Sequence, residues 1–258
     1  MSFLKFRSKL IDNLQSLTGQ SKLSQEKFLY RHLPSLLAEI ITRYFKVEIE
    51  GLENIPRQGP VIIAPNHSGF SGFDAIVLAY MIQKHAQRIP RVLTHQFWFL
   101  TKTTALPANK MGFIEASYEN GKSYLNKNNL IILFPEGEHG NFKPSHKMYE
   151  LQEFKRGFVR LALETKAVIV PTLVIGAEES SINLSQLKLS KFFRGLILPL
   201  PLNILPLPVK WKIKFLPHRE LPYDPNKMND RELVKDLCDE IQEEMQETLY
   251  KEIKMRKK

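Results

Sequence analysis

The sequence is poor in cysteine, with Cys238 as its single example. One cysteine excludes an intramolecular disulfide and leaves no cysteine cluster for zinc. The histidines also lack a metal-ligand spacing such as His-Glu-x-x-His, so we expect no metal. A chain of this kind fits a reducing, cytoplasmic compartment.

Long apolar runs are missing as well. A secretory signal needs an unbroken apolar stretch near the start, and Lys5, Arg7 and Lys9 interrupt it here. The longest apolar run, residues 195–209, is shorter than the roughly 20 residues of a bilayer-spanning helix. That run also contains four prolines, which break helices. We therefore expect neither a signal peptide nor a spanning helix.

Positive charge is what the chain has in excess. Its 258 residues carry a formal net charge of +10, which indicates negative partners: nucleic acid, anionic lipid or a phosphorylated substrate. Nucleic-acid binding is a competing hypothesis supported by charge alone, because the chain has no helix-turn-helix, zinc-finger or aromatic RNA-binding motif. We therefore predict no nucleic-acid partner.

The pattern along the chain changes twice. Residues 1–46 show apolar positions at three- and four-residue intervals and hold eight cations against three acids, which predicts amphipathic, membrane-docking helices. Residues 47–220 alternate short β-rich runs with helical stretches, which is typical of one α/β domain. Residues 221–258 form a helical extension. The predicted fold is α/β, with a mostly parallel central sheet flanked by helices, N-terminal amphipathic helices and a C-terminal helix.

The elements expected in the α/β domain are short. The predicted strands are residues 47–50, 61–64, 91–94, 130–134, 168–174 and 211–215, and the predicted helices are residues 74–87, 117–126, 154–165 and 230–254.

The segment most informative about chemistry is APNHSGFSGFD, residues 64–74, which joins an apolar strand to a helix. Activating an alcohol at neutral pH needs a base and a group that orients it, and His67 with Asp74 supplies both. Seven residues of regular helix rise about 10.5 Å, too far for a direct hydrogen bond. The chain must therefore turn back, and Gly69 and Gly72 give it the freedom to do so.

A second segment, LIILFPEGEHG at residues 130–140, is another buried strand that runs into a turn. Together the two segments resemble the first motif, Asn-His-x4-Asp, and the third motif, Phe-Pro-Glu-Gly-Thr-Arg, of the lysophospholipid and glycerolipid acyltransferase family. Residues 112–117 and 167–172 resemble its second and fourth motifs. The resemblance spans roughly residues 56–217 and is closest in kind to 1-acylglycerol-3-phosphate acyltransferases.

The sequence departs from the family pattern at three places. Six residues separate His67 from Asp74 where four are usual, which resembles a divergent bacterial branch. Glu138 and His139 replace the Thr-Arg pair, and Glu115 stands near a position where many members carry arginine. Phosphate-binding cations must therefore come from elsewhere, and the nearby candidates are Lys143, Lys155 and Arg156.

The resemblance implies a mechanism without a covalent acyl-enzyme. His67 would act as the general base on the acceptor hydroxyl, and Asp74 would hold its tautomer. The acceptor would be a lysophospholipid of the lysophosphatidic acid type, and acyl-CoA and acyl-carrier protein remain alternative co-substrates, with no cofactor. The residues expected to bind the acceptor are Asn66, Glu136, Gly137, Lys143 and Arg156.

Lipid substrates imply a membrane surface. We expect a peripheral protein on the cytoplasmic face of a bacterial inner membrane, bound to anionic lipid mainly through residues 1–46. Residues 192–209 are expected to reach the headgroup region.

Two other functions compete with acyl transfer. One is a non-catalytic, membrane-associated lipid-binding protein that retains the acyltransferase fold. The other is a serine hydrolase, whose nucleophile elbow needs Gly-x-Ser-x-Gly, but around Ser71 the last glycine is replaced by Phe73.

Overall fold

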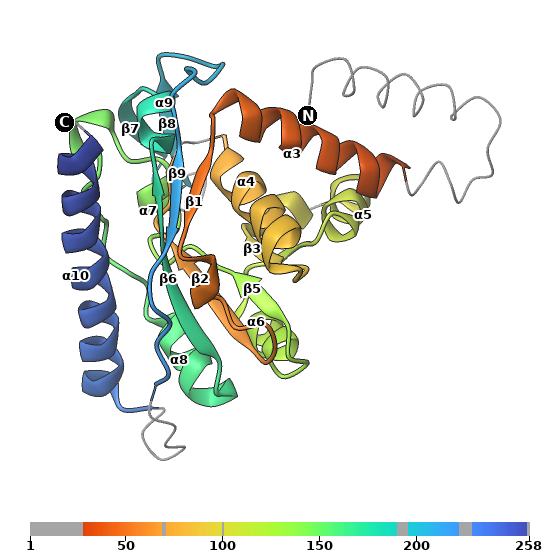
Figure 1. Ribbon diagram of the computed structural model, residues 1–258, viewed down its shortest axis with the longest axis vertical. Coiled ribbons are helices and arrows are strands. Elements are labelled where there is room, and N and C mark those ends of the chain that lie inside the picture. Colours follow the sequence, from red (N-terminus) through yellow and green to blue (C-terminus); the bar gives the residue numbers. More distant parts are fainter. Residues whose placement is uncertain (1–27, 69–70, 100, 190–195, 222–228, 257–258) are drawn as a thin grey trace.

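The computed structural model describes residues 28–68, 71–99, 101–189, 196–221 and 229–256 (Figure 1). Its centre is a seven-stranded sheet with the order β1-β9-β6-β2-β5-β3-β4. The strands are β1 (Glu48–Glu50), β2 (Val61–Pro65), β3 (Arg91–Thr94), β4 (Phe113–Glu115), β5 (Leu130–Ile132), β6 (Val168–Ile175) and β9 (Lys212–Phe215).

The sheet is mostly parallel, as the sequence predicts. Strands β6, β2, β5, β3 and β4 pair parallel in that order, whereas β9 pairs antiparallel with β6 and parallel with β1. All five residues of β2 are buried, because helices cover both faces of the sheet. A strand covered on both faces reads as a continuous apolar run, which is why the sequence identifies it.

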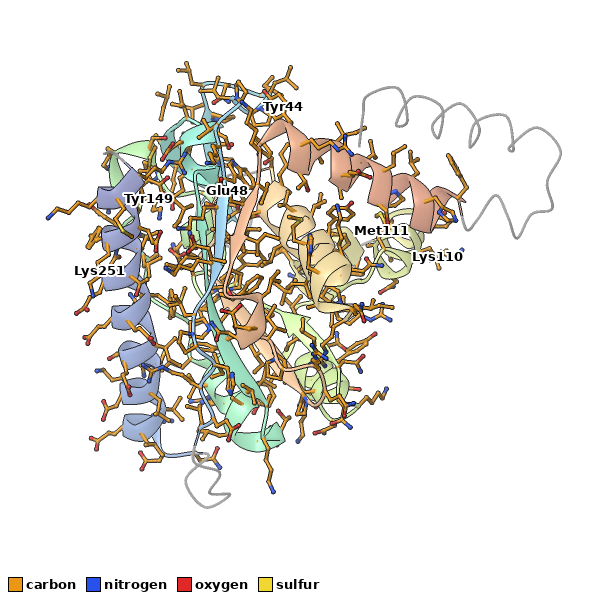
Figure 2. The ribbon with its side chains drawn as sticks, in the orientation of Figure 1. Tyr44, Glu48, Lys110, Met111, Tyr149 and Lys251 are labelled. Atoms are coloured by element: carbon orange, nitrogen blue, oxygen red, sulfur yellow. The ribbon has the colours of Figure 1, made fainter. Side chains whose placement is uncertain are left out.

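Helices form a layer on each face (Figure 1). Helices α3 and α4 pack with one hydrophobic cluster, and α8 and α10 pack with the other. Side chains fill both layers between sheet and helices (Figure 2). The helices are α3 (Leu33–Tyr44), α4 (Phe73–Met81), α5 (Lys102–Lys110), α6 (Tyr118–Leu125), α7 (Glu138–Asn141), α8 (Gly157–Thr165), α9 (Ala177–Ser180) and α10 (Arg231–Arg256), with short turns η1 (Phe28–His32), η2 (Leu52–Asn54), η3 (Ile82–Ala86), η4 (Gln96–Phe99) and η5 (Ser145–Lys147).

Helix α10 confirms the predicted C-terminal helix. Its buried side chains recur every three or four residues, and full burial of each large one contributes about 1.5–3 kcal/mol. Two polar side chains on the same helix, Gln242 and Gln246, accept hydrogen bonds from the backbone N–H of Phe154 (3.0 Å) and Leu151 (2.7 Å). The helix therefore also fixes the segment that leads into α8. The buried apolar stripe is Val234, Cys238, Ile241, Met245 and Leu249.

Several predicted boundaries differ from the structure. The helix predicted over residues 74–87 is α4 followed by the π-helical turn η3, which ends where Gln87 adopts φ 54°. The strand predicted over residues 130–134 ends at Ile132, because the following residues form a turn at the edge of the sheet. The helix predicted from residue 154 begins at Gly157, since the backbone N–H of Lys155 instead donates to Pro135 O at 2.9 Å.

The sequence does not predict the short strand β4, the helices α5, α7 and α9, or a separate hairpin that pairs β7 (Asn183–Leu189) with β8 (Leu196–Pro201). Of the predicted N-terminal helices, α3 is described, and residues 1–27 lie outside the described residues. Within the described ranges, no helix combines the length and apolar character needed to cross a bilayer.

Candidate active site

The candidate site lies at the carboxyl ends of β2 and β5, which are neighbouring parallel strands. His67 follows β2, and Glu136 follows β5. In an open parallel sheet this edge is where loops bring side chains from different strands together.

The loop after β2 folds back and joins His67 to Asp74. The distance from His67 Nδ1 to Asp74 Oδ2 is 2.6 Å. Gly72 makes the turn possible with φ 69°, a left-handed conformation that suits glycine. Asp74 then lies in the first turn of α4, buried, where its carboxylate also accepts the backbone N–H groups of Ser68 (3.0 Å) and Ala75 (2.8 Å).

These contacts favour one tautomer of a neutral imidazole. A carboxylate oxygen only accepts hydrogen bonds, so Asp74 Oδ2 pairs with a proton on His67 Nδ1. In that tautomer Nε2 carries a lone pair that can act as a base. The His67 ring also stacks on Phe134, with ring centroids 3.9 Å apart. The imidazole is therefore held on one edge by a carboxylate and on one face by an aromatic ring.

Glu136 holds the backbone at His67 by a hydrogen bond. It is fully buried, and its carboxylate accepts the backbone N–H groups of His67 (2.9 Å) and Gln152 (2.7 Å). Burial raises the pKa of this carboxyl, while the charge of Lys143 and the two backbone hydrogen bonds oppose the rise. The position of Glu136 indicates that it positions the catalytic loop. The sequence predicts that Glu136 contacts the acceptor. In the structure its carboxylate accepts hydrogen bonds from backbone N–H groups inside the protein.

Asn66 is also placed inside the protein. Its buried side chain donates to Val174 O (3.1 Å) and accepts from Val174 N (2.7 Å), so it extends the β2–β6 ladder. A large cavity opens beside His67. Asn66 is not among the described residues that line this cavity, although the sequence suggests an acceptor-binding role. Its side-chain amide instead anchors the end of β2 to β6, and this fixes the position of the backbone at His67.

Replacing Asn66 by alanine should therefore destabilise the fold. Both backbone groups of Val174 would lose their partner in a dry core, at about 1–3 kcal/mol for each group. We expect urea unfolding to show a loss in that range, whereas Asn126→Ala, at an exposed position, should change the free energy of unfolding little. Equal unfolding energies for the two variants would contradict this role.

One of the three candidate cations reaches the cavity. Lys155 lies over Gly137, where a Cβ would stand 2.9 Å from Lys155 Nζ. Lys143 instead points into the protein, and its buried amine pairs with Glu178 Oε1 at 3.0 Å. Arg156 precedes α8 and, like Lys143, is not among the described cavity-lining residues. Of the positions that the sequence predicts to bind the acceptor, Gly137 lines the cavity.

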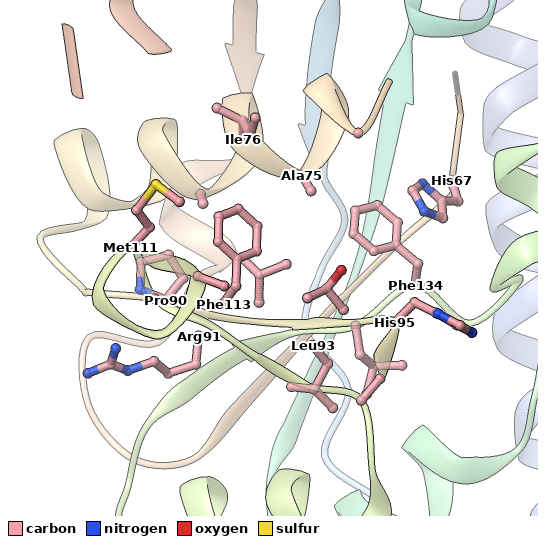
Figure 3. Close-up of a pocket in the computed structure, with 18 of the residues that line it drawn as sticks. His67, Ala75, Ile76, Pro90, Arg91, Leu93, His95, Met111, Phe113 and Phe134 are labelled. Carbon is pink, nitrogen blue, oxygen red and sulfur yellow. The ribbon is translucent and has the colours of Figure 1, made fainter. Parts of the chain in front are cut away.

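A cavity of about 1700 Å³ opens beside His67. Helices α3, α4 and α5, the β3 and β4 region and the turn after β5 form its walls. His67 and Phe134 lie at one end of the view in Figure 3, and Pro90, Arg91 and Met111 lie at the other. The lining is predominantly apolar, and the volume exceeds the roughly 300–1,000 Å³ of a typical small-molecule pocket. The space suits a long apolar chain whose polar end lies at His67.

Sequence reasoning missed three parts of this site. The first is Phe134, which follows β5 and stacks on His67, which follows the neighbouring strand β2. In the sequence, only its position next to Pro135 and Glu136 indicates that it lies near the site. Helix α3 lines the cavity, which its amphipathic periodicity alone does not reveal. The third is a polar contact at the cavity edge, where His95 Nε2 lies 3.1 Å from Glu138 Oε1. Glu138 thus lines the cavity where the family pattern has threonine.

Several known proteins are similar to this chain in sequence. The family model described as Acyltransferase matches residues 46–175, just over half of the 258 residues. An uncharacterized protein of Mycobacterium tuberculosis is 34% identical over 255 residues, covering 92% of this chain and 71% of its own length. A lyso-glycine lipid O-acyltransferase of Phocaeicola vulgatus is 31% identical over 137 residues, or 49% of this chain and 46% of that protein.

A solved structure shares the fold. The crystal structure of the 1-acyl-sn-glycerophosphate acyltransferase PlsC from Thermotoga maritima matches with a TM-score of 0.51 and 16% sequence identity. The match covers 85% of each chain. The mostly parallel sheet flanked by helices is therefore common to both proteins.

Proposed function

This chain belongs to the Acyltransferase family, and on that premise we propose that it moves a fatty acyl group from a thioester carrier to the hydroxyl of a lysolipid. The observation that carries the proposal is the His67–Asp74 pair at one end of a large apolar cavity. The pair is the kind of base that an alcohol needs at neutral pH, and the cavity has room for acyl chains.

The proposed reaction is a direct transfer. His67 Nε2 takes the proton of the acceptor hydroxyl while the hydroxyl oxygen attacks the thioester carbonyl carbon. The new C–O bond forms, the C–S bond breaks, and the proton passes from His67 to the departing thiolate. Asp74 stabilises the imidazolium that exists between these steps, as the carboxylate does in serine-protease triads. No serine needs to become acylated.

One cation in the cavity lining, Lys155, supports an anionic acceptor headgroup. Lys155 lies over Gly137, and a flexible ammonium suits a phosphate or a carboxylate. The relative from P. vulgatus is named for a lyso-glycine lipid, and the Thermotoga enzyme for a glycerophosphate. Lysophosphatidic acid and a lyso-glycine lipid are therefore the two acceptors to compare. For the donor, acyl-CoA and acyl-carrier protein are both retained.

We further propose a peripheral location on the cytoplasmic face of a bacterial inner membrane. In this organisation residues 1–46 dock on anionic lipid, residues 47–220 catalyse, and residues 221–258 brace the domain. The balance of eight cations against three acids in residues 1–46 supports the first assignment. The hydrogen bonds from α10 to the segment before α8 support the last.

The test is acyl transfer by the purified full chain on anionic vesicles. Radiolabelled acyl-CoA and acyl-carrier protein would be supplied in turn with each lysolipid, and products would be identified by mass spectrometry. We expect one labelled diacyl product, formed together with an equal amount of free thiol. A folded protein that binds lysolipid yet transfers nothing from either donor would instead be the non-catalytic lipid-binding protein.

A further inference from the structure

The segment after β8 presents apolar side chains to solvent. Ile204 and Leu205 are 85% and 82% exposed, the highest values among the large hydrophobic residues that the structure describes, and Leu202 is 64% exposed. Isolated exposed leucines are ordinary, but a cluster on one short segment marks an interaction surface.

Hydrogen bonds hold this segment in place. The backbone N–H groups of Leu202 and Leu207 donate to Ile182 O and Ser180 O, each at 2.8 Å. The Asn203 side chain accepts from Ile182 N (2.8 Å) and donates to Ser180 O (3.0 Å) and Leu205 O (2.8 Å). Polar groups of the bend are thus bonded within the protein while its apolar side chains face outward. Such a bend can enter an apolar medium at less cost than one with open backbone groups.

The segment is joined to α3, a wall of the cavity. The Tyr44 hydroxyl, at the end of α3 (labelled in Figure 2), donates to Pro206 O at 2.7 Å. The same helix also exposes Leu37 and Ile40, and Leu37, Ala38 and Ile41 line the cavity. These exposed side chains form one set, which we call the apolar rim: Leu37, Ile40, Tyr44, Leu202, Ile204, Leu205 and Leu207.

The sequence around this segment is positively charged, which favours an anionic partner. Residues 180–211 contain four cations and no acid. One of these cations, Lys210, pairs with Glu48 at 2.6 Å. Two copies of such a segment would repel each other, whereas an anionic leaflet attracts cations and accepts apolar side chains.

We propose that the apolar rim is a lipid-contact surface that enters an anionic leaflet, so that residues 202–207 dock together with the part of residues 1–46 that forms α3. This rests on the proposed function, because it assumes a lipid substrate. The contact sets α3 against the leaflet. A lysolipid can then pass along α3 into the cavity without its chain crossing water.

The experiment compares full-length wild type with the double variant Ile204→Ser/Leu205→Ser. The matched control is Tyr250→Ser/Met255→Ser, which removes two exposed apolar side chains from α10. Cosedimentation would use vesicles of phosphatidylcholine with phosphatidylglycerol, beside vesicles of phosphatidylcholine alone. Acyl transfer would be measured with a vesicle-borne lysolipid and with a short-chain, water-soluble acceptor.

We expect the rim variant to bind anionic vesicles roughly 10- to 100-fold more weakly, with the control near wild type. Its transfer to the vesicle-borne acceptor should fall in parallel, and transfer to the soluble acceptor should stay within about two-fold. Unchanged vesicle binding would overturn the proposal, as would a wild-type dimer in solution that the rim variant alone abolishes. Cosedimentation measures vesicle binding without requiring acyl transfer. If binding depends on the rim but no acyl group is transferred, the proposed function is refuted and the lipid-contact surface is still supported.

Discussion

Replacing His67 by glutamine is expected to lower kcat for acyl transfer by about 10²–10⁴-fold, the usual contribution of a positioned general base. Glutamine can still donate a hydrogen bond to Asp74, but it cannot take the proton of an alcohol. The KM values for donor and acceptor should change little, because the cavity walls remain. Initial rates of the purified variant on vesicles, with circular dichroism to verify folding, measure the effect.

Ser68→Ala is the matched control, because this side chain is adjacent to His67, and its buried Oγ has no hydrogen-bond partner in the structure. We expect its kcat to stay within about three-fold of wild type, since the backbone N–H that Asp74 accepts is unchanged. A large loss in Ser68→Ala, with a serine-reactive phosphonate labelling the wild type, would favour a serine hydrolase over direct transfer.

Asp74→Asn should be nearly as damaging. The carboxylate accepts three hydrogen bonds, and the amide that replaces it would turn a donor toward at least one of these groups. When the amide nitrogen faces His67, the ring takes the tautomer with the proton on Nε2, and that nitrogen cannot act as a base. The comparable change in a serine-protease triad costs about 10⁴-fold in kcat. Because Asp74 acts through His67, we expect a loss no greater than that of His67→Gln, within about 10²–10⁴-fold.

Asp239→Asn serves as the control for this charge, because Asp239 forms an exposed pair with Lys235 within one turn of α10. It should leave kcat unchanged. Urea unfolding of both variants separates a catalytic loss from a loss of stability. If Asp74→Asn stays folded and keeps its kcat within a few-fold, the carboxylate does not hold the base.

The sequence predicts strands well where burial is continuous. Residues 61–64 and 168–174 are largely apolar, β-branched runs, and the structure has the buried strands β2 and β6 there because helices cover both faces of the sheet. Strand β3 at residues 91–94 is predicted as well, although Val92 is its one fully buried residue. Strand β4 has only three residues and reads as a strand only beside β3. The sequence gives no local signal for such a pairing, nor for the β7–β8 hairpin.

The candidate site shows the same division between local and distant contacts. His67 and Asp74 belong to one loop, so their meeting follows from the glycines between them. Lys143 is near Glu136 in sequence, but α7 turns the chain so that its amine meets Glu178, which follows β6. Lys155, farther along the chain, reaches Gly137 instead. Distance along the chain therefore gives no guide to which cation faces the cavity.

The most direct test of the account is the rate of the double variant His67→Gln/Asp74→Asn beside the two single variants. If Asp74 acts by orienting His67, removing it from a protein that has already lost the imidazole costs almost nothing further. We therefore predict a kcat within about three-fold of His67→Gln alone. Losses that multiply would show that the two side chains act independently and would contradict a dyad at positions 67 and 74.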